Sequence, residues 1–67
     1  MEISARNQLR GKVKSISKSG LMAEVVVDVG GHEIVSLITS GSVDRMGLKV
    51  GDAVAAVIKS TEVMIAK

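Results

Sequence analysis

The sequence predicts an all-β fold: a small five-stranded barrel with one short helix between the third and fourth strands. The apolar residues are mostly β-branched, with eleven Val and six Ile against four Leu among 67 residues, and such side chains favour the pleated surface of a sheet. Seven glycines divide the chain into segments of strand length. The length allows one domain, which we expect to span residues 1–67.

Glycine pairs and alternating side chains locate the first three strands. We expect the first strand within residues 3–17, where apolar or small residues alternate with lysines in the second half. Residues 21–29 alternate again and are predicted as the second strand. Gly30-Gly31 is a two-residue hairpin signal, because glycine readily adopts the positive φ angles of such turns. Residues 32–39 then return as the third strand, antiparallel to the second.

The helix and the last two strands follow from the remaining segments. Residues 42–47 carry the one helical signal, with Ser42 as a candidate N-cap and Gly47 as a stop. Residues 52–59 and 62–66 are expected as the fourth and fifth strands. Five strands with a small helix after the third is the order of an OB-like barrel.

The composition excludes several classes of protein. A chain this short buries little surface and usually needs disulfides, a metal or partner subunits for stability. There is no cysteine for a disulfide, a thiolate metal site or a nucleophile, and His32 is the only histidine. No Ser/His/Asp trio or spaced carboxylate pair is recognisable. We therefore expect no catalytic residue, metal or cofactor, and stability that depends on association between copies.

Targeting signals are absent from the sequence. No apolar run approaches the roughly 20 residues of a membrane span, and residues 1–4 do not begin a charged-then-apolar secretory signal. We expect a cytoplasmic protein without membrane contact.

The charge distribution leaves three kinds of partner open. Residues 1–18 hold five basic side chains and one acidic, although the net charge of the whole chain is only +2. This segment could meet nucleic acid, another anion or an acidic surface of a neighbouring copy. OB folds bind single strands by stacking bases on aromatic side chains, and this chain has none. Nucleic-acid binding is the weakest of the three.

Hydrogen-bond donors gather at the ends of the predicted strands. On an extended chain, Ser4 and Arg6 point to the same side. Residues 39–42 are rich in hydroxyls at the predicted start of the helix, where backbone amides favour an anion. Residues 59–61 add an ammonium group and two hydroxyls. Solvated loops and helix caps have the same composition, so spacing alone leaves both a small-anion site and plain hydrophilic loops open.

Two sequence blocks resemble the molbindins, small cytoplasmic molybdate-binding proteins of bacteria. The blocks are Ile3–Leu9 (ISARNQL), followed by Gly11, and Ala56–Ile65 (AVIKSTEVMI). The same module occurs at the C-terminus of molybdate-responsive regulators and importer ATPases. The resemblance covers essentially the whole chain. It implies an OB-like barrel assembled as a hexamer, a trimer of dimers, with molybdate or tungstate held between subunits.

The resemblance also implies the residues of the oxyanion site. They come from the first strand, the start of the helix and the end of the fourth strand: Ser4, Ala5 through its backbone amide, Arg6, Thr39, Ser42, Lys59 and Ser60. Molybdate is a dianion without a proton to donate, so a site made only of donors suits it. A second class of site near the threefold axis is not assigned to residues here.

Two functions remain for comparison with the structure. The first is storage and homeostasis of the oxyanion by a free binding protein without enzymatic activity. The second is an oxyanion-sensing module that signals through protein–protein contacts, as a domain detached from a regulator or importer would. The absence of a DNA-binding helix and of a nucleotide-binding loop in these 67 residues favours the first.

Overall fold

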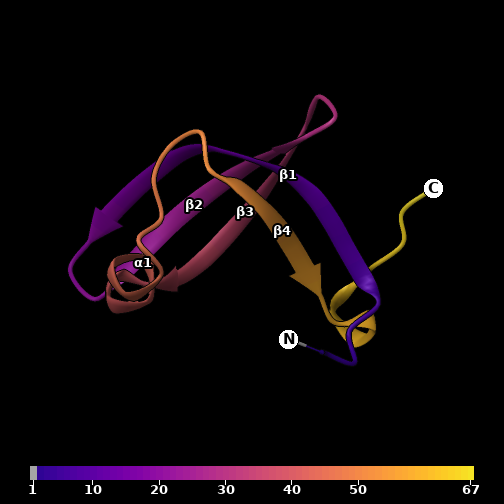
Figure 1. Ribbon diagram of the computed structural model, residues 1–67. Coiled ribbons are helices and arrows are strands. Elements are labelled where there is room, and N and C mark those ends of the chain that lie inside the picture. The colour runs from indigo at the N-terminus through magenta and orange to yellow at the C-terminus, as the bar shows by residue number, and fades with distance from the viewer. Residues whose placement is uncertain (1) are drawn as a thin grey trace.

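The chain forms one strongly curled antiparallel sheet with a short helix at one end (Figure 1). The computed structural model describes residues 2–67. Its strands are hydrogen-bonded in the order β3-β2-β1-β4. The elements are β1 (Asn7–Ser19), β2 (Met22–Val29), β3 (His32–Thr39), α1 (Ser40–Met46), β4 (Ala53–Ile58) and a 3-10 turn, η1 (Ser60–Glu62).

The β2–β3 hairpin turns where the glycine pair predicts it. Gly30 and Gly31 have φ angles of 57° and 88°, which place both in the left-handed region. The Asp28 carboxylate accepts a hydrogen bond from the Gly31 amide at 3.0 Å, and this contact holds the turn. The predicted two-residue hairpin is confirmed.

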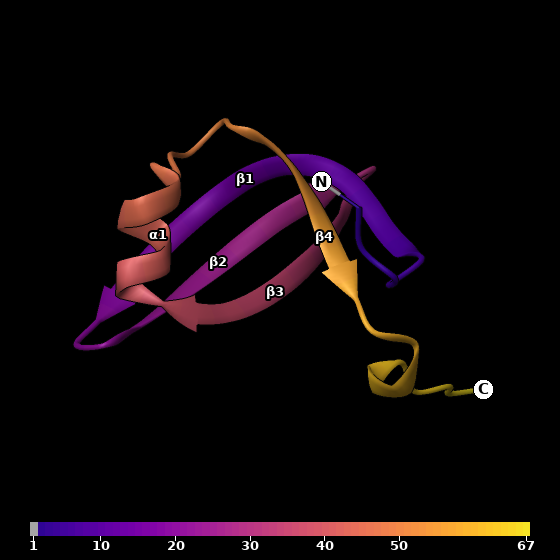
Figure 2. The same ribbon diagram turned by 60° about the horizontal axis from the view of Figure 1, so that its bottom comes forward.

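β1 is strongly bent and pairs with two different strands along its length. Residues 12–19 pair with β2, and residues 7–12 pair with β4. The β2 register shifts between Val13 and Ser15, as at a β-bulge. At Gly11 a Cβ atom would lie 2.2 Å from the carbonyl oxygen of Asp28, so only glycine allows this close crossing. The bend turns the sheet into an open half-barrel (Figure 2).

The helix begins two residues before the predicted cap. Thr39, not Ser42, is the N-cap, because its hydroxyl accepts a hydrogen bond from the Ser42 amide at 3.0 Å. Gly47, with φ 62°, ends the helix as predicted. Val43 is the one buried residue of α1. It packs with Val13, Ala23, Val25 and Val27 in the core, so α1 covers one end of the concave face.

The predicted fifth strand is not formed. Residues 62–66 were expected to complete the barrel, but the sheet has four strands, and the chain turns through η1 after β4. Residues 63–67 then run away from the sheet in an extended form without strand pairing (Figure 2). The apolar residues of this segment suit a strand, but within one chain the segment pairs with no sheet edge. The barrel therefore stays open between β3 and β4.

Neither helix within residues 2–67 has the length and hydropathy that a membrane span requires.

Candidate functional site

The seven predicted site residues fall into two groups at different places on the half-barrel. Five of them lie where the start of β1 meets the end of β4, and two lie at the junction of β3 and α1. We call the first group the Arg6 group, comprising Ser4, Ala5, Arg6, Lys59 and Ser60. The second is the Thr39 group, comprising Thr39 and Ser42.

The Arg6 group is assembled by the pairing of β1 with β4. Asn7 pairs with Ile58 at the end of this ladder. Arg6 directly precedes Asn7, and Lys59 directly follows Ile58. The backbones of Arg6 and Lys59 therefore leave the sheet side by side. Both side chains are exposed, and neither forms an ion pair with another described residue. Two free cations therefore stand at one end of the half-barrel.

The chain before β1 is held in a turn rather than in the extended form that the spacing of Ser4 and Arg6 suggested. The Gln8 side-chain amide donates to the Ala5 carbonyl oxygen at 2.9 Å, and β1 begins only at Asn7. Ala5 is half-buried. Because its carbonyl faces Gln8, the turn fixes the backbone around the predicted anion-binding amide.

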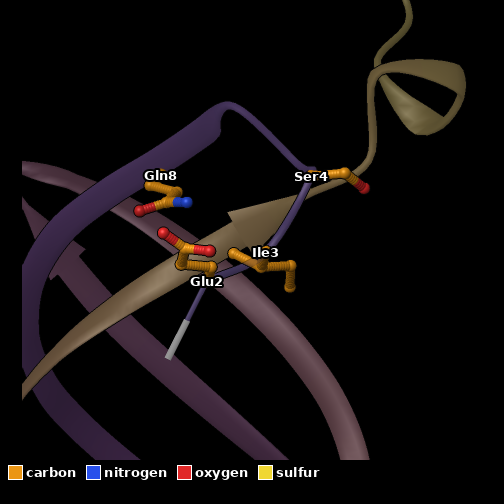
Figure 3. Close-up of a pocket in the computed structure, with 4 residues that line it drawn as sticks. All are labelled: Glu2, Ile3, Ser4 and Gln8. Atoms are coloured by element: carbon orange, nitrogen blue, oxygen red, sulfur yellow. The ribbon is translucent and has the colours of Figure 1, made fainter.

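A broad open hollow of about 590 Å³ lies beside this group, lined by Glu2, Ile3, Ser4 and Gln8. Figure 3 shows the Ser4 hydroxyl pointing away from the other three side chains. The Glu2 carboxylate lines the hollow, and a carboxylate offers an anion only repulsion. The lining of this hollow is therefore unfavourable for an anion, although it includes Ser4.

The Thr39 group is built by the cap of α1. The Thr39 hydroxyl donates to the Ser42 hydroxyl oxygen at 2.8 Å while it accepts from the Ser42 amide. The Arg45 guanidinium donates to the same Ser42 oxygen at 3.4 Å. The Ser42 hydroxyl oxygen accepts both of these hydrogen bonds, so its own proton is available to a ligand. The Thr39 group therefore offers one hydroxyl donor, with the Arg45 guanidinium beside it.

Arg45 is the residue here that sequence reasoning missed. Its signal was available, because residues three apart on a helix are neighbours on its surface, and Arg45 follows Ser42 by three. The residue was overlooked because the segment was interpreted only as a helix start and stop.

The two groups cannot meet within one chain. Thr39 pairs with Met22, which pairs with Ser19 at the end of β1, whereas Lys59 adjoins the beginning of β1 at Asn7. The thirteen residues of β1 separate these ends, in a molecule whose longest dimension is 34 Å. Figure 1 places α1 and η1 at opposite ends of the sheet.

Two of the four basic side chains of β1 form ion pairs. Lys14 bonds to Glu33 across the sheet, and Lys18 bonds to Asp44 of α1. The hydrogen bond and the charge of Glu33 raise the pKa of Lys14. Residues 2–67 contain no cluster of three or more acidic or histidine side chains that could hold a metal ion. Arg6 and Lys59 are thus among the cations without an ion pair in the described residues, as are Arg10 and Lys12 of β1.

Residues 3–65 match the TOBE domain. The chain belongs to the TOBE domain family. Among similar TOBE-domain relatives is molybdenum-pterin-binding protein 1 of Clostridium pasteurianum. It is 53% identical over 66 residues, which are 97% of each chain.

Solved structures share both the fold and the sequence of this TOBE chain. A molybdate-binding protein from Sporomusa ovata superposes with a TM-score of 0.96 at 45% identity, covering 100% of both chains. The cytoplasmic molybdate-binding protein ModG, in a form with molybdate bound, superposes with a TM-score of 0.85 at 44% identity. That match covers 90% of this chain and 43% of ModG. The OB-like half-barrel is thus the fold of molybdate-binding proteins.

Proposed function

We propose that this TOBE-domain chain binds molybdate, without catalysing a reaction, and stores and buffers it in the cytoplasm. The observation that carries the proposal is the match over the full length of both chains to a molybdate-binding protein, at a TM-score of 0.96 and 45% identity. The cytoplasmic location is supported by the likeness to ModG, which is itself described as cytoplasmic.

The chemistry of the candidate residues supports a tetrahedral dianion as ligand. Their side chains carry only hydroxyl, guanidinium and ammonium donors, and charge-assisted hydrogen bonds from such groups are the strong ones. Arg6 and Lys59 supply two positive charges against the two negative charges of molybdate. This balance matters because an uncompensated charge that is removed from water is very costly.

The separation of the two donor groups supports a site between copies. A molybdate ion bound by Arg6 and Lys59 can reach Thr39 and Ser42 only if these belong to another copy, since the chain holds them at opposite ends of β1. A closed assembly then forms several equivalent sites. The resemblance to molbindins supports a hexamer built as a trimer of dimers.

Pterin is the less suitable ligand, although the name of the Clostridium relative includes it. A pterin ring would normally stack on an aromatic side chain, and this chain has no Phe, Tyr or Trp. The donors instead suit the oxyanion itself.

Selectivity among oxyanions should depend on the hydrogen-bonding groups of the site and on the size of its cavity. The side chains of the candidate residues include no carboxylate, so among these side chains only hydroxyl oxygens could accept the proton of a protonated phosphate, and we expect this ligand to bind more weakly. Sulfate has the same charge and shape as molybdate, so only cavity size can reject it. Tungstate has the charge and shape of molybdate, and we propose that it binds as well.

Isothermal titration calorimetry with four oxyanions tests this function. We expect saturable binding of molybdate and tungstate, weaker binding of sulfate and still weaker binding of phosphate at neutral pH. Equal heats for all four anions, removed by moderate salt, would indicate unspecific attraction to exposed cations and contradict the proposal.

A further inference from the structure

Backbone carbonyl oxygens at the end of β4 are occupied by hydrogen bonds within the η1 turn. The Glu62 amide donates to the Lys59 carbonyl oxygen at 2.9 Å. The Val63 amide donates to the Ser60 carbonyl oxygen at 3.4 Å. A carbonyl oxygen is an acceptor only, so one that faced a bound anion would repel it. The turn therefore engages two acceptors that lie next to the Lys59 and Ser60 donors.

At the start of β1, a side chain occupies the corresponding acceptor. The Gln8 side-chain amide donates to the Ala5 carbonyl oxygen at 2.9 Å. This oxygen belongs to the peptide group that joins Ala5 to Arg6, which is planar and trans. The N–H of that group, the Arg6 amide, therefore points opposite to the carbonyl and away from the Gln8 side chain. No acceptor within residues 2–67 engages this amide.

Acceptors and donors are thus separated around the start of β1. The Glu2 carboxylate and the Gln8 side chain line the open hollow beside the Arg6 group. Figure 3 shows the Ser4 hydroxyl pointing away from these two side chains. The Arg6 amide is directed away from Gln8 as well. A donor-rich side of the chain therefore lies opposite a side that carries the acceptors.

We propose that Gln8 is a positioning residue that keeps the Ala5 carbonyl oxygen away from the oxyanion and thereby disfavours protonated oxyanions. The proposal rests on the proposed function and assigns its selectivity to a residue that does not bind the ligand. Without the Gln8 amide, the peptide group between Ala5 and Arg6 is free to rotate and to turn its oxygen toward the ligand. That oxygen would repel molybdate, which has no proton to donate, but would accept the proton of hydrogen phosphate.

The position and length of Gln8 suit this role. Its hydrogen bond closes a turn of three residues back to Ala5. Asn7 carries the other side-chain amide of this segment, but neighbouring residues of a strand point to opposite faces. The backbone of Gln8 pairs with Val57 in the ladder between β1 and β4, and this pairing does not depend on the side chain. A substitution of Gln8 should therefore leave the sheet intact.

Calorimetry with molybdate and with inorganic phosphate tests this role in the variant Gln8→Met. Methionine is similar in length to glutamine and has no donor for the Ala5 oxygen. The matched control is Ser17→Met, which changes an exposed residue at the other end of β1. Circular dichroism checks both folds. If Gln8→Met does not fold, Gln8→Thr takes its place, because threonine suits a strand and is too short to reach Ala5.

We expect Gln8→Met to raise the molybdate Kd by about threefold or more, the effect of losing one hydrogen bond. The phosphate Kd, measured by competition with molybdate, should stay the same or fall. The ratio of the two Kd values should therefore narrow by at least about threefold, and Ser17→Met should leave it unchanged. An unchanged ratio in Gln8→Met would overturn the proposal, including the case in which both anions bind equally more weakly, as they would if Gln8 only stabilised the fold.

The two proposals fail in different ways. Selective binding of molybdate by the natural chain, with an unchanged ratio in Gln8→Met, would refute the role of Gln8 and leave the proposed function intact. A natural chain that binds no molybdate would refute the proposed function and the role of Gln8 together.

Discussion

Asn7 pairs with Ile58 at the last rung of the ladder between β1 and β4. Arg6 and Lys59 directly adjoin this rung, Arg6 before β1 and Lys59 after β4. Neither side chain forms an ion pair with a described acidic residue. Although Arg6 and Lys59 are 53 residues apart in sequence, the fold places their backbones at the same end of the sheet. The predictions below begin from this pair.

Removal of either cation should weaken molybdate binding and leave the fold intact. We expect Arg6→Ala and Lys59→Ala each to raise the molybdate Kd more than about tenfold, since a hydrogen bond from a charged group contributes roughly 1.5–3 kcal/mol. Calorimetry measures the Kd, and circular dichroism checks the fold. Lys49→Ala, an exposed lysine between α1 and β4, is the control. Unchanged affinity in both site variants would remove the Arg6 group from the site.

The Thr39 hydroxyl should contribute to stability through the cap of α1. We expect Thr39→Ala to lower the free energy of unfolding by about 1 kcal/mol, because the Ser42 amide loses the acceptor it has at 3.0 Å. Thr39→Ser keeps an acceptor oxygen and should retain most of the stability. Urea denaturation compares the two. Equal destabilisation by Ser and Ala would show that the methyl group of Thr39, and not its hydroxyl, stabilises this junction.

Glycine should be required at position 11 and dispensable at position 41. In Gly11→Ala the new methyl group would meet the Asp28 carbonyl oxygen and a methyl group of Val29, and we expect a loss of about 2 kcal/mol or more. Gly41 lies in α1 with open space around it, so Gly41→Ala should be neutral or stabilising by up to ~1 kcal/mol. Thermal unfolding of both variants checks this. A fully stable Gly11→Ala would contradict the close crossing of β1 and β2.

The contact between Lys14 and Glu33 should appear as a pH effect only in alkaline solution. Glu33 raises the pKa of Lys14 above its ordinary 10.5. A raised pKa in the folded state contributes stability that is present below the unfolded pKa and is lost as the pH rises through the folded one. We expect Glu33→Gln to return the Lys14 pKa toward 10.5 in an NMR titration, with little change in stability near pH 7, since exposed ion pairs contribute little. An unchanged Lys14 pKa would show that the pair does not persist in solution.

Local signals in the sequence predicted most of the fold. The hairpin at Gly30 and Gly31 and the helix stop at Gly47 depend on glycine's access to positive φ, which is a property of the residue itself. The N-cap was placed three residues late, at Ser42 instead of Thr39, because both residues are capable caps and only the backbone geometry distinguishes them. A choice between two neighbouring residues that can both cap a helix cannot be made from the sequence pattern alone.

The fifth strand and the shape of the site could not be read from the sequence for a different reason. The apolar residues within 62–66 indicate that this segment suits a strand, but they do not say which edge of a sheet it pairs with. Likewise the resemblance named Arg6 and Thr39 as members of one site, and the sequence carries no sign that the fold holds them at opposite ends of β1. Both facts depend on contacts that are distant along the chain or lie between chains.

Native mass spectrometry with and without molybdate tests the central claim most directly, because it counts subunits and bound anions in the same particle. We predict an oligomer of an even number of copies, a hexamer in the leading case, that retains molybdate, while any free monomer retains none. A monomer that retains molybdate would contradict a site shared between copies, and an assembly that retains no oxyanion would contradict the proposed function.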